Sequence, residues 1–249
     1  MILDIRLRNV LSRLPSSFDH LSIPQFYGEY GKPETVPIER EDGKPLTSSI
    51  SAKAVIPVSL GKSAELFTLA DAEILLSDYG EAFAPASEPR RAEDSHIPLS
   101  YRPLEARFEP EGALTQSADI WSLAVSIWEI IGMRMIFSDE FRTEDDVVCQ
   151  YVDALGPMPR KWWERWEARH QFFNEDGSPK EGREIWPPAL DDAFEDFVQK
   201  YRRRFESGEF DKEESVALVD LMRRMLAFEP EKRPSAGEVL EWGRARSWI

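Results

Sequence analysis

The pattern of hydrophobic and polar positions predicts a chain built mainly from helices. Its most apolar stretch, Ile120 to Ile131, carries hydrophobic residues on nearly every side, which is typical of a buried helix, and Gly132 is placed to end it. Apolar residues also recur three or four positions apart in other segments, at 143–155, 162–170, 194–205, 218–226 and 235–242. We therefore expect many helices and few strands.

Two of these helices have recognisable starts. Thr143 precedes a run of acidic residues that suits the first turn of a helix. Ser235 stands three residues before Glu238, which is the spacing of a capping box. In this last helix, Leu240 is expected to face inward together with the apolar residues beside it, Val239 and Trp242.

Two short apolar segments predict a small β-hairpin. Residues 9–11 and 73–77 have strand length, and we expect them to pair antiparallel. The segment between them, 12–72, is rich in Pro, Gly, Ser and charged residues, so it is predicted to be an irregular surface insertion. The whole chain, 1–249, is expected to form one domain around it.

Composition narrows the range of partners. The 46 acidic and 31 basic residues give a net charge of −15, which disfavours direct nucleic-acid binding and favours basic partners. The alternative is that this acidity serves only solubility. The single cysteine, Cys149, excludes an internal disulfide and a cysteine-rich zinc site.

The sequence also predicts a cytoplasmic or nuclear protein. No apolar run reaches the length of a membrane span. The first motif of chemical interest begins at Asp4, which leaves no room for a secretory signal before it.

Two polar motifs are candidates for one active site. Residues 4–9 read Asp-Ile-Arg-Leu-Arg-Asn, and residues 77–80 read Ser-Asp-Tyr-Gly. Phosphoryl transfer needs a group that meets the acceptor hydroxyl and oxygen ligands for a metal ion, and Asp4, Asn9 and Asp78 are residue types that supply them. Each motif arises often by chance, so their order and surroundings carry the argument.

With the later motifs included, the chain resembles a eukaryotic protein kinase, and specifically its large C-terminal lobe. Residues 4–9 match the catalytic loop, and Asp78-Tyr79-Gly80 matches the Asp-Phe-Gly motif. Further matches follow in the order found in kinases, and they are Arg102-Pro103-Leu104-Glu105 for Ala-Pro-Glu, the buried Asp119-Ile120-Trp121, and the late arginine Arg233. The resemblance covers essentially the whole chain.

Within the kinases, the chain is most similar to the serine/arginine-rich protein kinase group, particularly its divergent fungal members. Residues 75–83, 101–108 and 152–156 carry this resemblance. It implies a mainly α kinase C-lobe that phosphorylates serine or threonine of Arg/Ser-rich proteins, with ATP and Mg²⁺ as cofactors.

The resemblance also implies a role for each matching residue. Asp4 would act as general base, and Arg6, which stands where most kinases have lysine, would neutralise the transferring phosphoryl group. Asn9 and Asp78 would bind the metal and, through it, the nucleotide. The residues expected to be structural are Gly80, Glu105, Asp119 and Arg233, with Glu105 paired to Arg233.

Two departures from the kinase pattern change what we expect. Ile2-Leu3 replaces the usual His-Arg, so no arginine is placed to pair with a phosphorylated activation loop. The printed sequence also holds no glycine-rich loop, strand lysine or helix glutamate ahead of Asp4. We expect a chain without that nucleotide-clamping lobe to be nearly inactive by itself.

Three functions therefore remain open. The chain is either the catalytic half of a serine/threonine kinase or a non-catalytic, pseudokinase-like module that binds basic partners. A small-molecule phosphotransferase is the third, because Asp-Ile-x-Leu-x-Asn also resembles that group. The motifs at 103–105, at 119–121 and at Arg233 argue against the third, since they belong to kinases with protein substrates.

Overall fold

The computed structural model describes residues 4–14, 16–58, 60, 66–68, 71–132, 134–140 and 142–246. Ile2 and Leu3, which stand in place of His-Arg, lie outside the described residues. Contacts divide the chain into two compact units, which are residues 1–11 with 76–249, here called the helical lobe, and residues 12–75, here called the insert unit.

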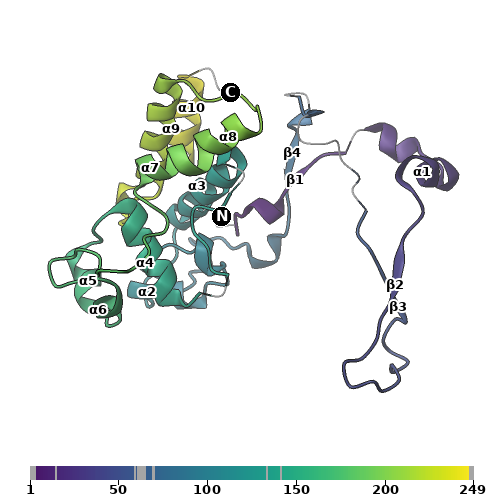
Figure 1. Ribbon diagram of the computed structural model, residues 1–249, viewed down its shortest axis with the longest axis horizontal. Coiled ribbons are helices and arrows are strands. Elements are labelled where there is room, and N and C mark those ends of the chain that lie inside the picture. Colours follow the sequence, from purple (N-terminus) through teal and green to yellow (C-terminus); the bar gives the residue numbers. More distant parts are fainter. Residues whose placement is uncertain are drawn as a thin grey trace. The chain divides into compact units, whose positions relative to one another are not determined.

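The helical lobe contains nine α-helices among its described residues (Figure 1). They are α2 (Glu105–Phe108), α3 (Gln116–Gly132), α4 (Glu144–Leu155), α5 (Arg160–Arg165), α6 (Arg169–Phe172), α7 (Leu190–Phe194), α8 (Lys200–Arg204), α9 (Lys212–Met225) and α10 (Ala236–Arg244). A π-helical turn, Glu195–Gln199, joins α7 to α8. The mainly helical fold class predicted from the sequence is confirmed.

Helix α3 forms the centre of the hydrophobic core. Its Trp121 and Trp128 are both 0% exposed, and the ring of Trp121 stacks on Phe137 with 6.3 Å between centroids. The C-terminal end of α3 closely approaches the π-helical turn, since a Cβ atom at Gly132 would lie 3.1 Å from the carbonyl oxygen of Phe197. Gly132 therefore permits this helix packing as well as ending α3.

The helix starts agree with the sequence, but the predicted inward orientation of Leu240 is wrong. Thr143 caps α4, and Ser235 forms the predicted capping box with Glu238 at α10. Leu240 is 42% exposed, because i, i+3 spacing places Val239 and Trp242 on the face that packs against the core and turns Leu240 away.

The segment 162–170, whose spacing is helical, is divided between two short helices. Helix α5 ends at Arg165, and Trp166 lies in the turn before α6. Trp162 and Trp166 are buried, as expected for core residues, and each indole N–H donates to a carboxylate, of Glu109 and Asp145 respectively. These two polar contacts fix both rings in place across the break between the helices.

The predicted hairpin strands are present as β1 (Val10–Ser12) and β4 (Ile74–Leu76), which pair in a two-stranded sheet. Just beyond β4, the backbone N–H of Ser77 donates to the carbonyl of Asn9 at 2.8 Å, and its hydroxyl donates to the same oxygen at 3.1 Å. These bonds hold the residue before Asp78 against the end of the 4–9 loop.

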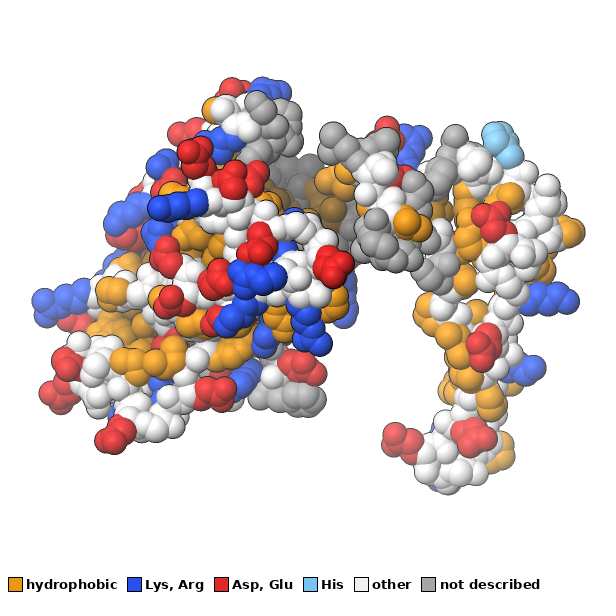
Figure 2. Space-filling view, turned by 45° about the horizontal axis from the view of Figure 1, so that its top comes forward, with side chains coloured by type: hydrophobic (Ala, Val, Ile, Leu, Met, Phe, Trp, Pro, Cys, Tyr) orange, Lys and Arg blue, Asp and Glu red, His pale blue; other side chains and the backbone are white. Residues whose placement is uncertain are grey.

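The insert unit has elements that the sequence analysis did not predict. It contains the helix α1 (Ile23–Tyr30) and a hairpin of β2 (Thr35–Pro37) with β3 (Lys53–Val55), in which Val36 lies opposite Ala54. Phe26 packs on Phe18 and Tyr30, with ring centroids 5.7 and 5.1 Å apart. Hydrophobic side chains remain exposed along the hairpin, among them Val36, Val55 and Ile56 (Figure 2).

Candidate active site

The loop of residues 4–9 is closed by its own asparagine. Asn9 is 5% exposed, and its amide nitrogen donates to the backbone carbonyl of Asp4 at 2.9 Å. A single 3₁₀ turn, Leu7–Asn9, occupies the second half of the loop. The Asn9 side chain thereby fixes the backbone of Asp4, while its carbonyl oxygen is not used in this bond.

Asp78 adopts a backbone conformation that non-glycine residues seldom take. Its φ and ψ are 61° and 60°, in the left-handed region, which aspartate tolerates better than most residues. Such conformations cluster at functional sites, where the surrounding structure holds them.

Arg6 lies between the two aspartates. Its Nη2 atom is 3.0 Å from Oδ2 of Asp4 and 3.6 Å from Oδ2 of Asp78. The side chain of Asp4 is 7% exposed, whereas that of Asp78 is 59% exposed. The structure therefore brings together four residues that the sequence proposes for one site, namely Asp4, Arg6, Asn9 and Asp78.

The environment of Asp4 favours proton binding. Burial raises the pKa of its carboxyl above the ordinary 3.8, Arg6 lowers it, and the charges of Asp78 and Glu81 raise it further. Its Oδ1 atom is buried and has no hydrogen-bond partner among the described residues. A carboxylate oxygen of this kind is suited to accept a hydrogen bond from a hydroxyl group.

Side chains of the segment after Gly80 line a small cavity beside Asp4. Its volume is about 20 Å³, which is room for about one water molecule. Glu81 lies on its wall, with Nδ1 of His96 at 3.1 Å and Nη1 of Arg90 at 3.4 Å from its Oε2 atom. Sequence reasoning missed Glu81, because no local pattern indicates that Arg90 and His96, nine and fifteen positions later, contact it.

The residues expected to bind magnesium fit that ion in their chemistry. The Asn9 carbonyl oxygen and the exposed Asp78 carboxylate are hard oxygen ligands, and Mg²⁺ typically takes one or two protein oxygens and keeps several waters. Among the described residues, no group of three or more His, Cys, Asp or Glu side chains could hold a metal ion. Mg²⁺ would therefore need water or substrate oxygens beside Asn9 and Asp78.

Glu105 and Arg233 form a buried bidentate ion pair. Two guanidinium nitrogens of Arg233 donate to the two carboxylate oxygens at 2.6 and 2.7 Å, and the Arg233 side chain is 0% exposed. Arg233 also donates to three backbone carbonyls, of Ser117, Ala227 and Phe228. The pair thus joins α2 to two later parts of the chain, the start of α3 and the segment after α9.

The other two residues expected to be structural differ in what surrounds them. Asp119 is 7% exposed in the first turn of α3, where a negative charge is favourable. Gly80 lies in a 3₁₀ turn, and a Cβ atom there would meet Asp78 at an ordinary 3.7 Å. The geometry thus places no steric requirement for glycine at position 80.

A buried pair that the sequence did not predict lies close to the loop of residues 4–9. The hydroxyl of Tyr101 donates to Oε2 of Glu129 on α3 at 2.5 Å. Burial raises the pKa of Glu129, and burial together with this hydrogen bond raises that of Tyr101, while a backbone hydrogen bond from Leu7 acts in the opposite direction. Glu129 interrupts the apolar stretch 120–131, which is a sign of a buried acidic group in the sequence. Its partner Tyr101 could not be identified from the sequence.

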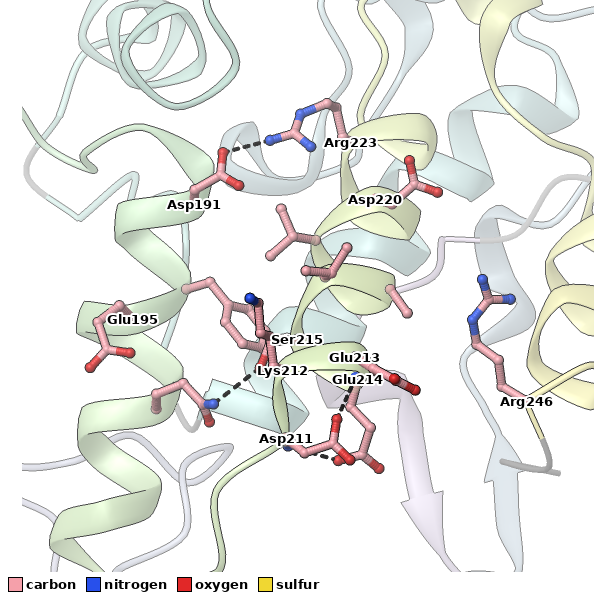
Figure 3. A pocket seen from close by; sticks show the side chains of 15 residues that line it. Asp191, Glu195, Asp211, Lys212, Glu213, Glu214, Ser215, Asp220, Arg223 and Arg246 are labelled. Carbon is pink, nitrogen blue, oxygen red and sulfur yellow. Dashed lines mark hydrogen bonds and ion pairs between the residues drawn. The ribbon is translucent and has the colours of Figure 1, made fainter.

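A larger groove lies elsewhere, between α7 with the π-helical turn and α9 (Figure 3). Its volume is about 1210 Å³, and no residue of the candidate site lines it. On its wall, Arg223 pairs with Asp191 at 2.6 Å, and the backbone N–H of Glu214 donates to Asp211 at 2.8 Å.

Within the described part of the chain, no helix is both long and apolar enough to span a bilayer. No protein-family model matches the chain. Comparison with characterised proteins, in contrast, finds several relatives.

The serine/threonine-protein kinase SRPK of Physarum polycephalum is 31% identical over 128 residues, which is 49% of this chain and 28% of that protein. The serine/threonine-protein kinase SKY1 of Saccharomyces cerevisiae is 29% identical over 154 residues, 58% of this chain and 19% of the relative. Protein kinase dsk1 of Schizosaccharomyces pombe is 29% identical over 127 residues, 49% of this chain and 21% of the relative. The chain thus spans less than a third of each of these proteins. Its relatives are serine/threonine kinases of the SRPK family, as its motifs predict.

Proposed function

We propose that the site of Asp4, Arg6, Asn9 and Asp78 transfers the γ-phosphoryl group of ATP to a serine or threonine hydroxyl of a protein. The observation that carries the proposal is the buried Oδ1 of Asp4, which has no hydrogen-bond partner among the described residues and lies on a carboxylate that Arg6 links to Asp78. This is the arrangement that positions an acceptor hydroxyl beside a site for phosphate and metal.

In this mechanism Asp4 Oδ1 accepts the hydrogen bond of the acceptor hydroxyl and then takes its proton. The hydroxyl oxygen forms the new bond to phosphorus, and the bond to the β-phosphate oxygen breaks to release ADP. Arg6 supplies positive charge next to the transferred group, and its guanidinium is held for this by Asp4. Asn9 and Asp78 would hold Mg²⁺, which supplies charge neutralisation of the phosphates when bound.

The substrates we propose are serines among arginines in Arg/Ser-rich proteins. This rests on the resemblance to the SRPK group and on the net charge of −15. On the face seen in Figure 2, acidic and basic side chains of the helical lobe are interspersed, so selection of arginine would depend on local carboxylates and not on a uniformly negative surface.

A radiolabel assay tests the proposal. A nucleotide-binding lobe from the Physarum relative is fused in front of Met1, and transfer of labelled phosphate from ATP to an Arg/Ser-rich peptide is followed with and without Mg²⁺. We expect Mg²⁺-dependent transfer by the fusion, at least about 100-fold slower transfer by the 249-residue chain alone, and loss of transfer with Asp78→Asn. A folded fusion that binds ATP but transfers nothing would refute the proposal.

The alternative, a non-catalytic module for basic partners, has one observation in its favour. Arg6 already contacts both aspartates, so each carboxylate has a positive charge beside it without a metal or nucleotide. In that case the fusion would bind the Arg/Ser-rich peptide and leave it unphosphorylated.

A further inference from the structure

We propose that Arg6 is a built-in competitor for divalent cations at Asp78, so that the site takes Mg²⁺ only as the guanidinium leaves that carboxylate. The proposal rests on the proposed function, since it concerns regulation of the same site. It follows from the position that arginine takes here in place of the lysine usual in kinases.

The two contacts of Arg6 differ in strength. One atom, Nη2, makes both, at 3.0 Å to the buried Asp4 and at 3.6 Å to the exposed Asp78. The shorter contact with the buried carboxylate is the anchor, because burial reduces screening of the charges by solvent. The longer contact at the surface is the one that opens.

The guanidinium of Arg6 is also incompletely held. Its Nε atom is buried without a hydrogen-bond partner among the described residues. Arg233 in the same molecule is held more completely, because its Nε and both terminal nitrogens all donate hydrogen bonds. Arg6 therefore loses little on turning away from Asp78, provided that it keeps Asp4.

The charges of Mg²⁺ and of the guanidinium determine which of the two binds Asp78 more strongly. A guanidinium offers one delocalised charge, whereas Mg²⁺ offers two charges and binds carboxylate oxygens directly. Since Asp78 is 59% exposed, a hydrated ion can reach it without opening the core. Ion binding at Asp78 and the Arg6–Asp78 contact oppose each other, because the ion and the guanidinium carry like charge and Arg6 lies 3.6 Å from Oδ2 of the same carboxylate.

Metal binding to the full 249-residue chain tests the proposal, with Mn²⁺ as the probe and free Mn²⁺ measured by electron paramagnetic resonance. Arg6→Gln should tighten Mn²⁺ binding on the order of tenfold, because it removes a unit charge 3.6 Å from the ligand carboxylate. Arg8→Gln is the matched control, since it removes the same charge from the same loop at a residue that is not paired with Asp4 or Asp78. It should change the Mn²⁺ affinity by less than about twofold. The double variant Arg6→Gln with Asp78→Asn should lose the gain.

A second measurement follows the arginine itself. In the nitrogen–proton NMR spectrum, the Nε–Hε signal of Arg6, assigned by its disappearance in Arg6→Gln, should move as Mg²⁺ is added, and the Arg8 signal should stay in place. Circular dichroism checks that each variant is folded.

Unchanged or weaker Mn²⁺ binding in folded Arg6→Gln overturns the proposal, and so does the absence of Asp78-dependent binding in that variant. These results are separable from failure of the proposed function. Phosphate transfer by the fusion with no effect of Arg6→Gln on metal affinity would reject only the competition. A gain in affinity without any transfer would reject only the kinase activity.

Discussion

Glu105→Gln should strongly destabilise the helical lobe. The substitution keeps the shape of the side chain, but it turns an amide NH₂ group toward the guanidinium of Arg233 and removes the charge that compensates it. Arg233 is 0% exposed at the side chain, so water cannot replace the lost partner. Removing one member of a buried ion pair costs about 3–5 kcal/mol, and retention of one acceptor oxygen places this variant near 3 kcal/mol.

The matched control is an exposed pair of the same length. Arg233 Nη1 and Arg223 Nη2 each lie 2.6 Å from a carboxylate oxygen, but the Arg223 and Asp191 side chains are 53% and 72% exposed. Asp191→Asn should therefore cost less than about 1 kcal/mol.

Urea unfolding followed by tryptophan fluorescence measures both variants, and the ring of Trp121 lies 5.1 Å from the Arg233 guanidinium carbon. A cost of 3 kcal/mol corresponds to a fall in melting temperature of about 6–12 °C for a domain of this size. Equal losses of stability in the two variants would refute the reasoning from burial.

Three further predictions concern stability and binding. Burial raises the pKa of Glu129, so the stability of the wild-type protein should increase as the pH falls from above that raised pKa toward the ordinary 4.5. Glu129→Gln should abolish this part of the pH dependence of the urea midpoint. The same pH dependence in the variant and the wild type would contradict this prediction. Gly132→Ala should destabilise the protein by about 1–3 kcal/mol, because the new Cβ meets the backbone of Phe197. Gly28→Ala in α1, where a Cβ meets open space, should not destabilise it. Equal changes in melting temperature for the two variants would count against the packing argument. The chain should bind a labelled Arg/Ser-rich peptide weakly, but more tightly than it binds a Glu-rich control peptide. Binding should weaken at high salt, since the Debye length is already only about 8 Å at physiological ionic strength. Equal binding of both peptides in a fluorescence titration would mean that the acidity of the chain serves only solubility.

Local patterns in the sequence predicted the helices well, because capping residues and apolar spacing are local signals. Ser235 with Glu238 and the apolar run that became α3 are examples. Helix α1 was missed although Ser22 and Gln25 form a capping box, because the surrounding composition indicated an irregular insertion. A short helix with few apolar neighbours gives too weak a periodic signal to outweigh composition.

The site could be proposed from motifs, but its geometry could not. Asp4 and Asp78 come together through the β1–β4 pairing and the bonds of Ser77 to Asn9, which depend on contacts between residues far apart in the sequence. Arg6 lies between the aspartates, and Asp78 takes a left-handed backbone conformation. Neither follows from residue spacing, and the catalytic and metal-binding roles of these residues stay predictions.

The most direct test of the central claim is the rate at which the fusion carrying Asp4→Asn transfers labelled phosphate to the Arg/Ser-rich peptide. The substitution keeps the size of the side chain but removes the buried oxygen that accepts the proton, so transfer should fall by about 100-fold or more. Asp19→Asn, at an exposed position of the insert unit, is the matched control and should leave the rate unchanged. Transfer by Asp4→Asn at the control rate would contradict the assignment of this site as the centre of phosphoryl transfer.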